Sequence, residues 1–265
     1  MYSKGQLLLK YLQYYFTASN GKGHGMHSPF VFEFIAKILN DKTVYLEYEK
    51  VETLRNQLLN DNTVLEVEDL GAGSVIAKKS KRSISSIAKN AANPKKFGQL
   101  LFRMIKHYQP ATIFELGTSL GITTSYLSLA KPDGRLITME GSKEIAEVAK
   151  RNLKSLKAGN TEIVEGNFDN TLSSVVSRLS TVDFAFIDGN HRKEPTERYF
   201  KELLAKTNNN SILVFDDIHW SSEMESAWET IKKDAAVTCS IDLFFIGIVF
   251  FRKEFKEKQH FVIRY

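Results

Sequence analysis

The sequence predicts an α/β fold in which helices cover both faces of a mixed, mostly parallel β-sheet. The main reason is that strand-like and helix-like segments alternate from residue 111 onward at the spacing of βαβ units. The length of 265 residues can bury a sizeable core, and 43% hydrophobic and 25% charged residues are typical of globular proteins. Two strand candidates at the end of the chain leave no room for a helix between them, so they must form an antiparallel hairpin.

Residues 1–93 are expected to form a mostly helical extension or cap. Its second helix has the clearest start, because Ser28 can cap a helix whose first residue is Pro29. The glycines at 71–73 are read as a turn, since no clear helix follows them. The expected elements are helices over 5–17, 28–39 and 48–59 and a strand over 63–69.

A basic stretch follows this turn. Between Leu70 and Leu100 there is no Asp or Glu, and the stretch reads either as a solvated loop and helix start or as a site for an anionic substrate or nucleic acid. The first interpretation is favoured, because such stretches are common on surfaces and the net charge of +5 is weak evidence for an anionic partner. The basic residues are Lys78, Lys79, Lys81, Arg82, Lys89, Lys95 and Lys96.

The second part of the chain, residues 94–265, carries the strand–helix alternation. It opens with an amphipathic helix over 97–108 that ends before Pro110. The expected strands are 112–116, 135–139, 161–165, 182–187, 211–215, 236–241 and 243–252, and the expected helices are 121–131, 143–156, 169–179, 194–206 and 221–234.

The cysteine content and the hydropathy of the sequence indicate the cellular compartment of the protein. The single cysteine, Cys239, excludes an internal disulfide and a Cys-rich zinc site and fits a reducing compartment. No stretch approaches the roughly 18 apolar residues of a membrane span. The N-terminal segment lacks a small-residue cleavage site, so we expect no signal peptide, a cytoplasmic protein and no membrane partner.

Acids and glycines follow nearly every expected strand. In a parallel sheet, ligands bind beyond the carboxyl ends of the strands, so these residues are the candidates for a site. In chain order they are Glu115 with Gly117 and Gly121, Glu140 with Gly141, Gly166 with Asn167 and Phe168, Asp188 with His191, and Asp216 with Asp217 and His219.

The residues after the first two expected strands, around Glu115 and Glu140, indicate the ligand. The spacing Gly117-x-x-x-Gly121 differs from the Gly-x-Gly-x-x-Gly of dinucleotide folds, and alone it is a weak signal. Glu115 beside this loop would repel a pyrophosphate but suit a cationic amino group. Glu140 at the end of the next strand can accept both hydroxyls of a ribose. A ribose, a cationic amino-acid end and no pyrophosphate describe S-adenosylmethionine.

Five segments carry a resemblance to a known family. The chain resembles the class I S-adenosylmethionine-dependent methyltransferases over about residues 94–252, most closely the catechol and caffeoyl-CoA type of O-methyltransferase. The resemblance implies a Rossmann-like, seven-stranded mixed sheet in the order 3-2-1-4-5-7-6, with strand 7 antiparallel. The segments are FELGTSLG (114–121), TMEGS (138–142), EGNF (165–168), AFIDGNH (185–191) and VFDDIHW (214–220).

The resemblance also implies roles for the strand-end residues. Glu140 and Gly141 would hold the ribose, Asn167 and Phe168 would flank the adenine, and Asp188 would lie close to the cofactor. The methionine end would be held by Glu115, Gly117, Thr118, Ser119 and Gly121.

A divalent cation, Mg²⁺ or another, is implied at Asp188, Asp216 and Asp217. Three converging carboxylates would repel one another without a cation, and carboxylate oxygens suit Mg²⁺. The family usually has Asn where Asp217 stands, so a different kind of site stays open. The alternative is that Asp216 or Asp217 caps the helix over 221–234 or pairs with a nearby Lys or Arg.

Asp188 and His191 are the candidate catalytic residues. His191 could take a hydroxyl proton near neutral pH, or it could bond within its own loop, which is slightly favoured. His219 and Trp220 either line the acceptor pocket or pack in the core.

The expected reaction is methyl transfer from S-adenosylmethionine to a hydroxyl of a small molecule. One alternative is a nucleic-acid (RNA) or protein methyltransferase, although Ile187-Asp188-Gly189-Asn190 stands where amino-directed enzymes carry Asn-Pro-Pro-Tyr or Asp-Pro-Pro-Tyr. A nicotinamide dehydrogenase and a non-catalytic relative that binds the cofactor are further alternatives. A homodimer is left open, with the extension as cap or dimer contact.

Overall fold

The computed structural model describes residues 1–69 and 78–265. The glycine turn expected at 71–73 lies outside the described residues. The chain divides into two compact units: unit 1 holds residues 1–41 and 172–265, and unit 2 holds residues 42–171. The expected extension is thus shared between both units, and its boundary at residue 93 stays a prediction.

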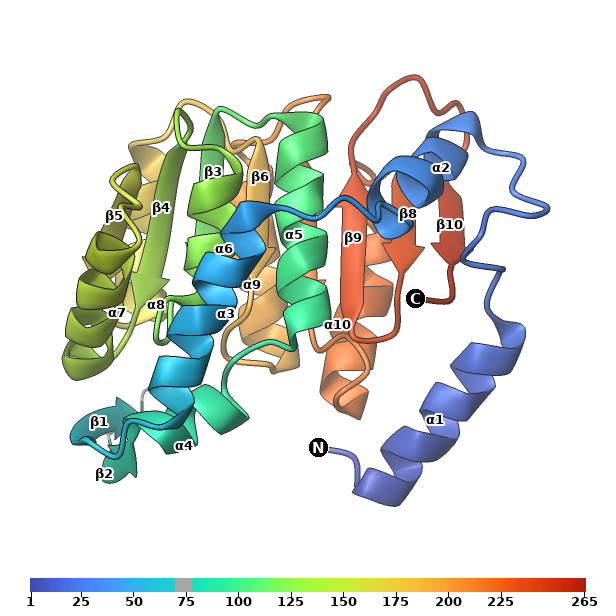
Figure 1. The fold of residues 1–265 in the computed structure, drawn as a ribbon. Helices are drawn as coiled ribbons and strands as arrows, with labels where there is room; N and C mark the ends of the chain where they lie inside the picture. Colours follow the sequence, from blue (N-terminus) through green and yellow to red (C-terminus); the bar gives the residue numbers. More distant parts are fainter. Residues whose placement is uncertain (70–77) are drawn as a thin grey trace. The chain divides into compact units, whose positions relative to one another are not determined.

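Unit 2 contains three parallel strands in the order β3-β4-β5, together with a two-stranded antiparallel hairpin, β1-β2 (Figure 1). Its elements are α3 (Leu46–Leu59), β1 (Val64–Asp69), β2 (Lys78–Ser83), α4 (Ile84–Asn90), α5 (Lys95–Tyr108), β3 (Thr112–Leu116), α6 (Ile122–Ala130), β4 (Arg135–Glu140), α7 (Lys143–Ser155), β5 (Thr161–Glu165) and the start of α8 (Phe168–Ser177).

The core of unit 2 depends on one close helix contact. Along α5, Leu100, Leu101 and Ile105 are fully buried. A Cβ placed on Gly98 of this helix would lie only 2.5 Å from the Tyr126 ring of α6. Glycine therefore permits α5 to pack directly on α6, where any other residue would push the two helices apart.

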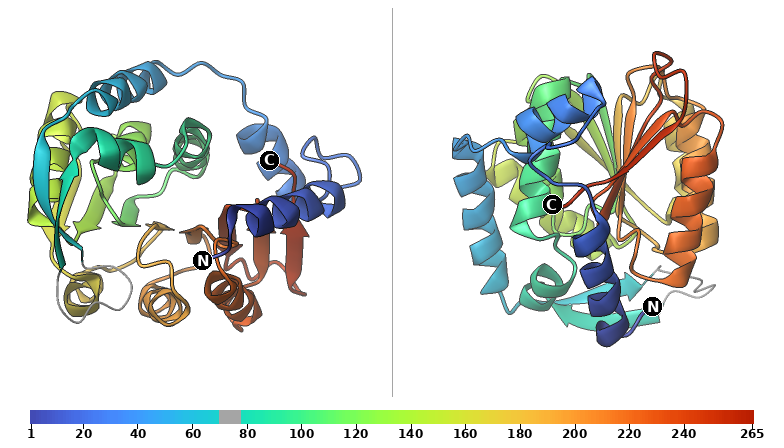
Figure 2. Two further views of the ribbon diagram at one scale, coloured as in Figure 1. Left: turned by 90° about the horizontal axis from the view of Figure 1, so that it is seen from below. Right: turned by 90° about the vertical axis from the view of Figure 1, so that its right-hand side faces the viewer.

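Unit 1 contains strands in the order β10-β8-β9-β7-β6, in which β9 is antiparallel to both of its neighbours. Helix α1 and the C-terminal strands lie side by side (Figure 2). The elements are α1 (Lys4–Thr17), α2 (Pro29–Phe34), a π-helical turn (Ile35–Leu39), the end of α8, β6 (Phe184–Ile187), α9 (Lys193–Leu204), β7 (Ile212–Asp216), α10 (Ser222–Lys233), β8 (Cys239–Asp242), β9 (Ile246–Phe250) and β10 (Gln259–Val262).

The predicted fold class is confirmed: unit 2 has three parallel strands and unit 1 has a mixed set of five, with helices between the strands. In chain order the strands of unit 2 follow the expected run 3-2-1, and those of unit 1 follow 4-5-7-6, with the seventh strand antiparallel. Strand β10, parallel to β8, is an eighth strand that the sequence did not predict.

The basic stretch differs from its expected loop, because its residues 78–83 form β2. Its register with β1 sets the basic residue Lys81 opposite the acidic residue Glu66. Opposite charges across a ladder stabilise antiparallel pairs, which explains how a segment of low strand propensity becomes a strand. Among the described helices, none combines the length and the apolar character needed to cross a membrane.

Candidate active site

The glycine loop of unit 2 connects β3 to α6 and is pinned to the neighbouring strand. The backbone N–H groups of Gly117 and Thr118 both donate to the carbonyl of Met139, at 3.0 Å. Gly117 and Gly121 have φ values of 101° and 81°, in the region that glycine adopts without strain. Ser119 also has a positive φ, of 47°, although its side chain makes this region less favourable than it is for glycine. The two glycines therefore fix where the loop turns.

Glu140, the last residue of β4, joins this loop to the next turn. Its Oε2 accepts the backbone N–H of Ser119 at 2.8 Å. Its Oε1 accepts the backbone N–H of Ser142 at 2.9 Å, across the intervening residue Gly141. The side chain is partly exposed. A carboxylate has about four acceptor sites, so both oxygens can accept further hydrogen bonds from a ligand while they hold the two loops.

Glu115 lies beneath the loop and is fully buried. Its Oε2 accepts the hydroxyls of Thr124 and Thr138, each at 2.6 Å. The hydroxyl of Thr118 lies 2.6 Å from that of Thr138 and extends the network to the loop. The sequence analysis named Thr118 but missed Thr124 and Thr138, although Thr124 lies in the first turn of the helix after the loop and Thr138 belongs to the TMEGS segment.

After β5, Asn167 directly precedes helix α8. Its Oδ1 accepts the N–H of Asp169 at 2.9 Å, and its carbonyl accepts the hydroxyl of Thr171 at 2.8 Å. Gly166 donates its N–H to the carbonyl of Glu140 at 2.9 Å. Phe168 is partly exposed at the first turn of the helix. Every residue expected at the cofactor, apart from Asp188, therefore lies at or just beyond the carboxyl ends of the three strands of unit 2.

In unit 1, the carboxyl ends of the parallel strands β6 and β7 bring three acids together. Asp216 is 7% exposed. Burial, the charges of Asp188 and Asp217 and a hydrogen bond with Asp188 raise the pKa of Asp216 well above its ordinary value. Burial also raises the pKa of Asp217, with the charge of Asp188 adding to it and that of His191 opposing it. Proton uptake is thus favoured at this group of acids.

His191 lies at the edge of this group, with its Nε2 3.3 Å from Oδ1 of Asp188 and a side chain that is 31% exposed. Burial alone would lower the pKa of His191. The hydrogen bond to Asp188, together with the charges of Asp188 and Asp217, outweighs burial and raises this pKa. His191 therefore favours the imidazolium form, which neutralises part of the negative charge.

The geometry of a metal site is not formed by these side chains. Asp188 and Asp216 share a hydrogen bond, and no group of three or more His, Cys, Asp or Glu side chains in ligand geometry occurs within residues 1–69 and 78–265. The alternative that Asp216 or Asp217 caps the helix after β7 is wrong, because the cap of α10 is Ser221, whose hydroxyl accepts the N–H of Met224 at 3.2 Å.

His219 has both ring nitrogens engaged by carboxylates. Its Nδ1 lies 3.0 Å from Oε1 of Glu225, and its Nε2 lies 2.8 Å from Oδ2 of Asp242. The ring also stacks on Phe244. His219 thereby connects the loop after β7 to α10 and β8. The pKa of His219 is raised, because the two carboxylates outweigh the opposing effect of burial.

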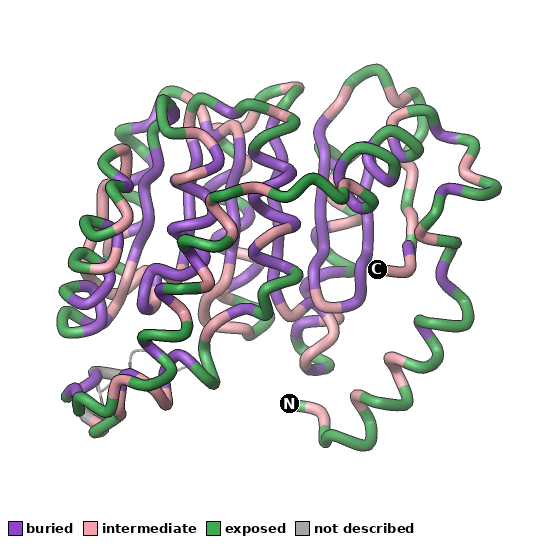
Figure 3. The backbone as a smooth tube through the Cα atoms, viewed as in Figure 1, coloured by how far each residue is buried: buried purple, intermediate pink, exposed green. Residues whose placement is uncertain are grey.

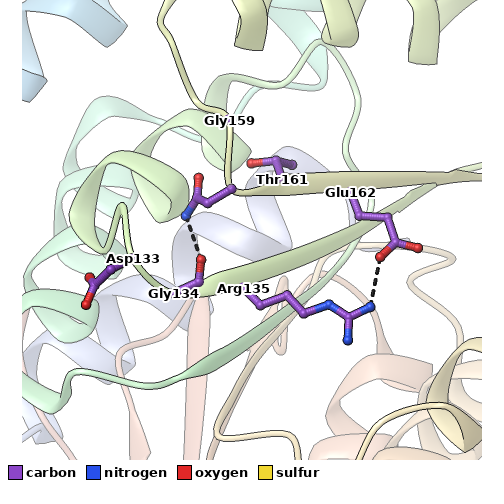
Figure 4. A pocket seen from close by; sticks show the side chains of 7 residues that line it. Asp133, Gly134, Arg135, Gly159, Thr161 and Glu162 are labelled. Atoms are coloured by element: carbon purple, nitrogen blue, oxygen red, sulfur yellow. Dashed lines mark hydrogen bonds and ion pairs between the residues drawn. The ribbon is translucent and has the colours of Figure 1, made fainter.

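A pocket of about 350 Å³ lies elsewhere in unit 2 (Figure 4). It occupies the amino ends of β4 and β5, opposite the glycine loop, and an ion pair of 3.0 Å between Arg135 and Glu162 crosses it. None of the candidate site residues lines it. The lining residues are Asp133, Gly134, Arg135, Gly159, Asn160, Thr161 and Glu162.

Sequence comparison finds a family model that covers most of the strand-end residues. Residues 114–218 match the family model described as a methyltransferase domain. The catechol O-methyltransferase of Mycobacterium tuberculosis (strain ATCC 25618 / H37Rv) is 29% identical over 123 residues, which are 46% of this chain and 54% of that protein. The match thus spans about half the length of this curated relative.

Solved structures share the fold. The O-methyltransferase TomG from Streptomyces achromogenes, in complex with SAM, has a TM-score of 0.54 and 21% identity over 62% of this chain and 82% of that chain. The SAH-bound methyltransferase PaMTH1 of Podospora anserina has a TM-score of 0.59 and 14% identity over 86% and 97%. The O-methyltransferase from Bacillus cereus, in complex with SAH, has a TM-score of 0.56 and 17% identity over 83% and 97%.

Proposed function

We propose, from the premise that residues 114–218 are a methyltransferase domain, that the chain transfers a methyl group from S-adenosylmethionine to a hydroxyl group of a small molecule. The resemblance expected from the sequence is confirmed by this match. The observation that carries the proposal is the position of Glu140, whose carboxylate lies at the end of β4 and holds the glycine loop through Ser119. A diol such as a ribose matches a carboxylate placed in this way.

Unit 2 supplies the groups for the cofactor. Glu140 accepts the ribose hydroxyls, and Asn167 and Phe168 flank the adenine. The loop from Gly117 to Gly121 holds the methionine end. Glu115 is completely buried and bonded to two threonine hydroxyls, so we assign it to the support of this loop and to the electrostatic attraction of the amino group.

Replacing Glu140 by alanine is expected to weaken S-adenosylmethionine binding at least tenfold, about 1.4 kcal/mol. The variant loses the ribose acceptor and releases the Ser119 N–H. Isothermal calorimetry measures the affinity. The control is Glu162→Ala, because Glu162 is an exposed acid near the amino end of β5, whereas Glu140 lies at the carboxyl end of β4. Unchanged affinity in a folded Glu140→Ala protein would contradict the assignment.

Unit 1 supplies the groups for the acceptor. In the reaction the acceptor oxygen bonds to the methyl carbon as the carbon–sulfur bond breaks, and the hydroxyl proton passes to a base. His191 has a raised pKa and sits 3.3 Å from Asp188, so it is better suited to hold Asp188 than to take this proton. We therefore assign proton acceptance to Asp188. Alignment of the reacting atoms supplies several kcal/mol more.

The side chains of Asp188, Asp216 and Asp217 do not stand in ligand geometry, but carboxylate oxygens are the donors that a divalent cation such as Mg²⁺ takes. Asp188 and Asp216 would hold it, and their mutual repulsion would fall. When bound, such a cation would stabilise the acceptor oxyanion.

Excess EDTA is accordingly expected to reduce methyl transfer to background and to leave S-adenosylmethionine affinity within twofold, because the cofactor residues lie on unit 2. Transfer of labelled methyl groups to phenolic, catecholic and acyl-thioester acceptors, with and without Mg²⁺, measures the first quantity, and calorimetry measures the second. Full activity in excess EDTA would remove the cation from the proposal.

The small-molecule acceptor is favoured over RNA because the basic positions of β2 stand opposite acidic positions of β1. We also propose that the protein works in the cytoplasm, where the buried thiol of Cys239, the single cysteine of this sequence, stays reduced.

A further inference from the structure

Helix α1 is fixed firmly to unit 1. A capping box of Ser3 and Gln6 closes its N-terminus. Lys10 forms an ion pair of 3.0 Å with Glu225 of α10, and the hydroxyl of Tyr14 donates to the carbonyl of Ile263. The last two contacts attach the middle and the C-terminal part of the helix, so its orientation on unit 1 is defined.

The inner face of α1 packs on the turn between β8 and β9. Leu7, Tyr11 and Tyr14 contact this turn, and the Tyr11 ring meets the edge of Phe244 at a centroid distance of 5.1 Å. The apolar residues that remain on the helix are therefore not needed for its attachment.

Most of α1 is exposed (Figure 3). Its outer face carries a second set of apolar residues, which we name the α1 stripe. Its side chains expose on the order of 600 Å², the upper end of the ~300–600 Å² that the largest apolar patch on a typical monomer covers. A standard interface buries about 800 Å² per partner, so the stripe supplies most of one. The exposed fractions are 58% for Leu8, 69% for Leu9, 41% for Leu12, 41% for Tyr15 and 77% for Phe16.

The order of residues along the stripe is symmetric. Leu9, Leu12 and Phe16 are spaced by three and four residues, which is the seam by which one helix packs along another. If two copies of α1 run antiparallel about an axis at Leu12, Leu8 meets the partner's Phe16 and Leu9 meets the partner's Tyr15. Each leucine then faces an aromatic ring, and one surface buries itself against its own copy, as a twofold interface requires.

The charges around the stripe favour a protein partner over a lipid surface. Helix α1 carries two charged residues, of which Lys10 is already paired with Glu225. One further cation, the guanidinium of Arg264, lies over the Tyr15 ring at 4.3 Å from its centroid. Membrane-surface helices carry many Lys and Arg on the polar face. In the antiparallel arrangement the exposed Lys4 side chains of the two copies lie at opposite ends, so they do not repel each other.

We propose that the α1 stripe is the interface of a twofold-symmetric homodimer in which two α1 helices pack antiparallel with Leu12 at the axis. The proposal does not depend on the methyl-transfer chemistry, because none of the stripe residues belongs to the candidate site.

Sedimentation-velocity centrifugation of the full chain at micromolar concentration tests this interface. A dimer is expected for the wild-type chain, and Leu9→Glu is expected to shift it to monomer with at least a tenfold higher dissociation constant. The matched control is Leu46→Glu, because Leu46 of α3 is exposed to 74% and lies outside the stripe; it should remain dimeric. A wild-type monomer, or a dimer unaffected by Leu9→Glu, would overturn the proposal.

Disulfide cross-linking tests the axis independently of any loss of stability. Under mild oxidation Leu12→Cys is expected to form a covalent dimer, and Leu46→Cys is expected to stay monomeric on a non-reducing gel. Cys239 does not interfere, because burial raises the pKa of its thiol to about 12. Failure of Leu12→Cys to cross-link in a dimeric protein would contradict the antiparallel arrangement.

Co-sedimentation with vesicles of phosphatidylglycerol and phosphatidylcholine separates the lipid alternative. No binding is expected, whereas binding that Leu9→Glu abolishes would assign the stripe to a membrane surface and overturn the homodimer.

Discussion

Replacing His219 by alanine is expected to lower the free energy of unfolding by about 3 kcal/mol, because it leaves two carboxylates without their shared partner. Asp242 is 6% exposed, and its Oδ2 would keep only the indole N–H of Trp228, at 3.3 Å. Glu225 would keep Tyr2 and Lys10, so most of the loss arises at Asp242. Urea unfolding followed by fluorescence measures the change.

The loss should also depend on pH. The folded-state pKa of His219 is raised, so its stabilisation is fully present below the unfolded-state pKa of about 6.5 and is lost as the pH rises through the folded-state value. The difference between wild type and His219→Ala is therefore expected to be larger at pH 6 than at pH 9. A difference that stays constant across this range would contradict a charged His219.

The matched control is His260→Ala. His260 is also a histidine of unit 1, but it is exposed and has Ser240 as a side-chain partner at 2.8 Å. Its removal should cost less than about 1 kcal/mol, the ordinary contribution of one hydrogen bond.

Replacing Asp216 by alanine is expected to lower methyl transfer at least a hundredfold, about 2.7 kcal/mol in the barrier. Asp216 is the buried hydrogen-bond partner of Asp188, to which we assign the acceptor proton. The variant should fold normally, since it relieves the crowding of like charges at this strand end. Its affinity for S-adenosylmethionine should change less than threefold, because the proposed cofactor residues of unit 2 are untouched.

Steady-state transfer of labelled methyl groups to the best acceptor measures this loss, and Asp183→Ala is the control because Asp183 precedes the amino end of β6. Asp216→Asn separates the hydrogen bond of Asp216 from its charge, because the amide can still bond to Asp188 but carries no charge. More than a tenth of wild-type turnover in Asp216→Ala would show that Asp216 is not part of the acceptor site.

The sequence predicted the position of the strand-end residues because parallel strands expose their carboxyl ends on one edge. The alternation of strand-like and helix-like segments shows where each strand ends. Glu140 and Asp216 could therefore be assigned to that edge of the sheet from the sequence alone. The bonds of His219 could not be predicted, since Glu225 and Asp242 come from a helix and a strand that only the folded chain brings to it. The buried hydroxyls that bond Glu115 were missed for the same reason.

Strands β2 and β10 show a second limit. Residues 78–83 of β2 have low strand propensity and acquire their structure from the acidic strand opposite them. Strand β10 is four residues long and is defined by its pairing with β8. The hydrophobic pattern of a segment does not predict such pairings, because they depend on the partner strand rather than on the segment itself.

The attachment of α1 to Glu225, Phe244 and Ile263 has a consequence for the order of synthesis. A ribosome makes this helix before its docking partners, which follow more than two hundred residues later in the chain. During that interval the inner apolar side of the helix lacks its native contacts in unit 1, so the nascent chain exposes both apolar sides of α1. Chaperone binding during translation should therefore concentrate on residues 4–17.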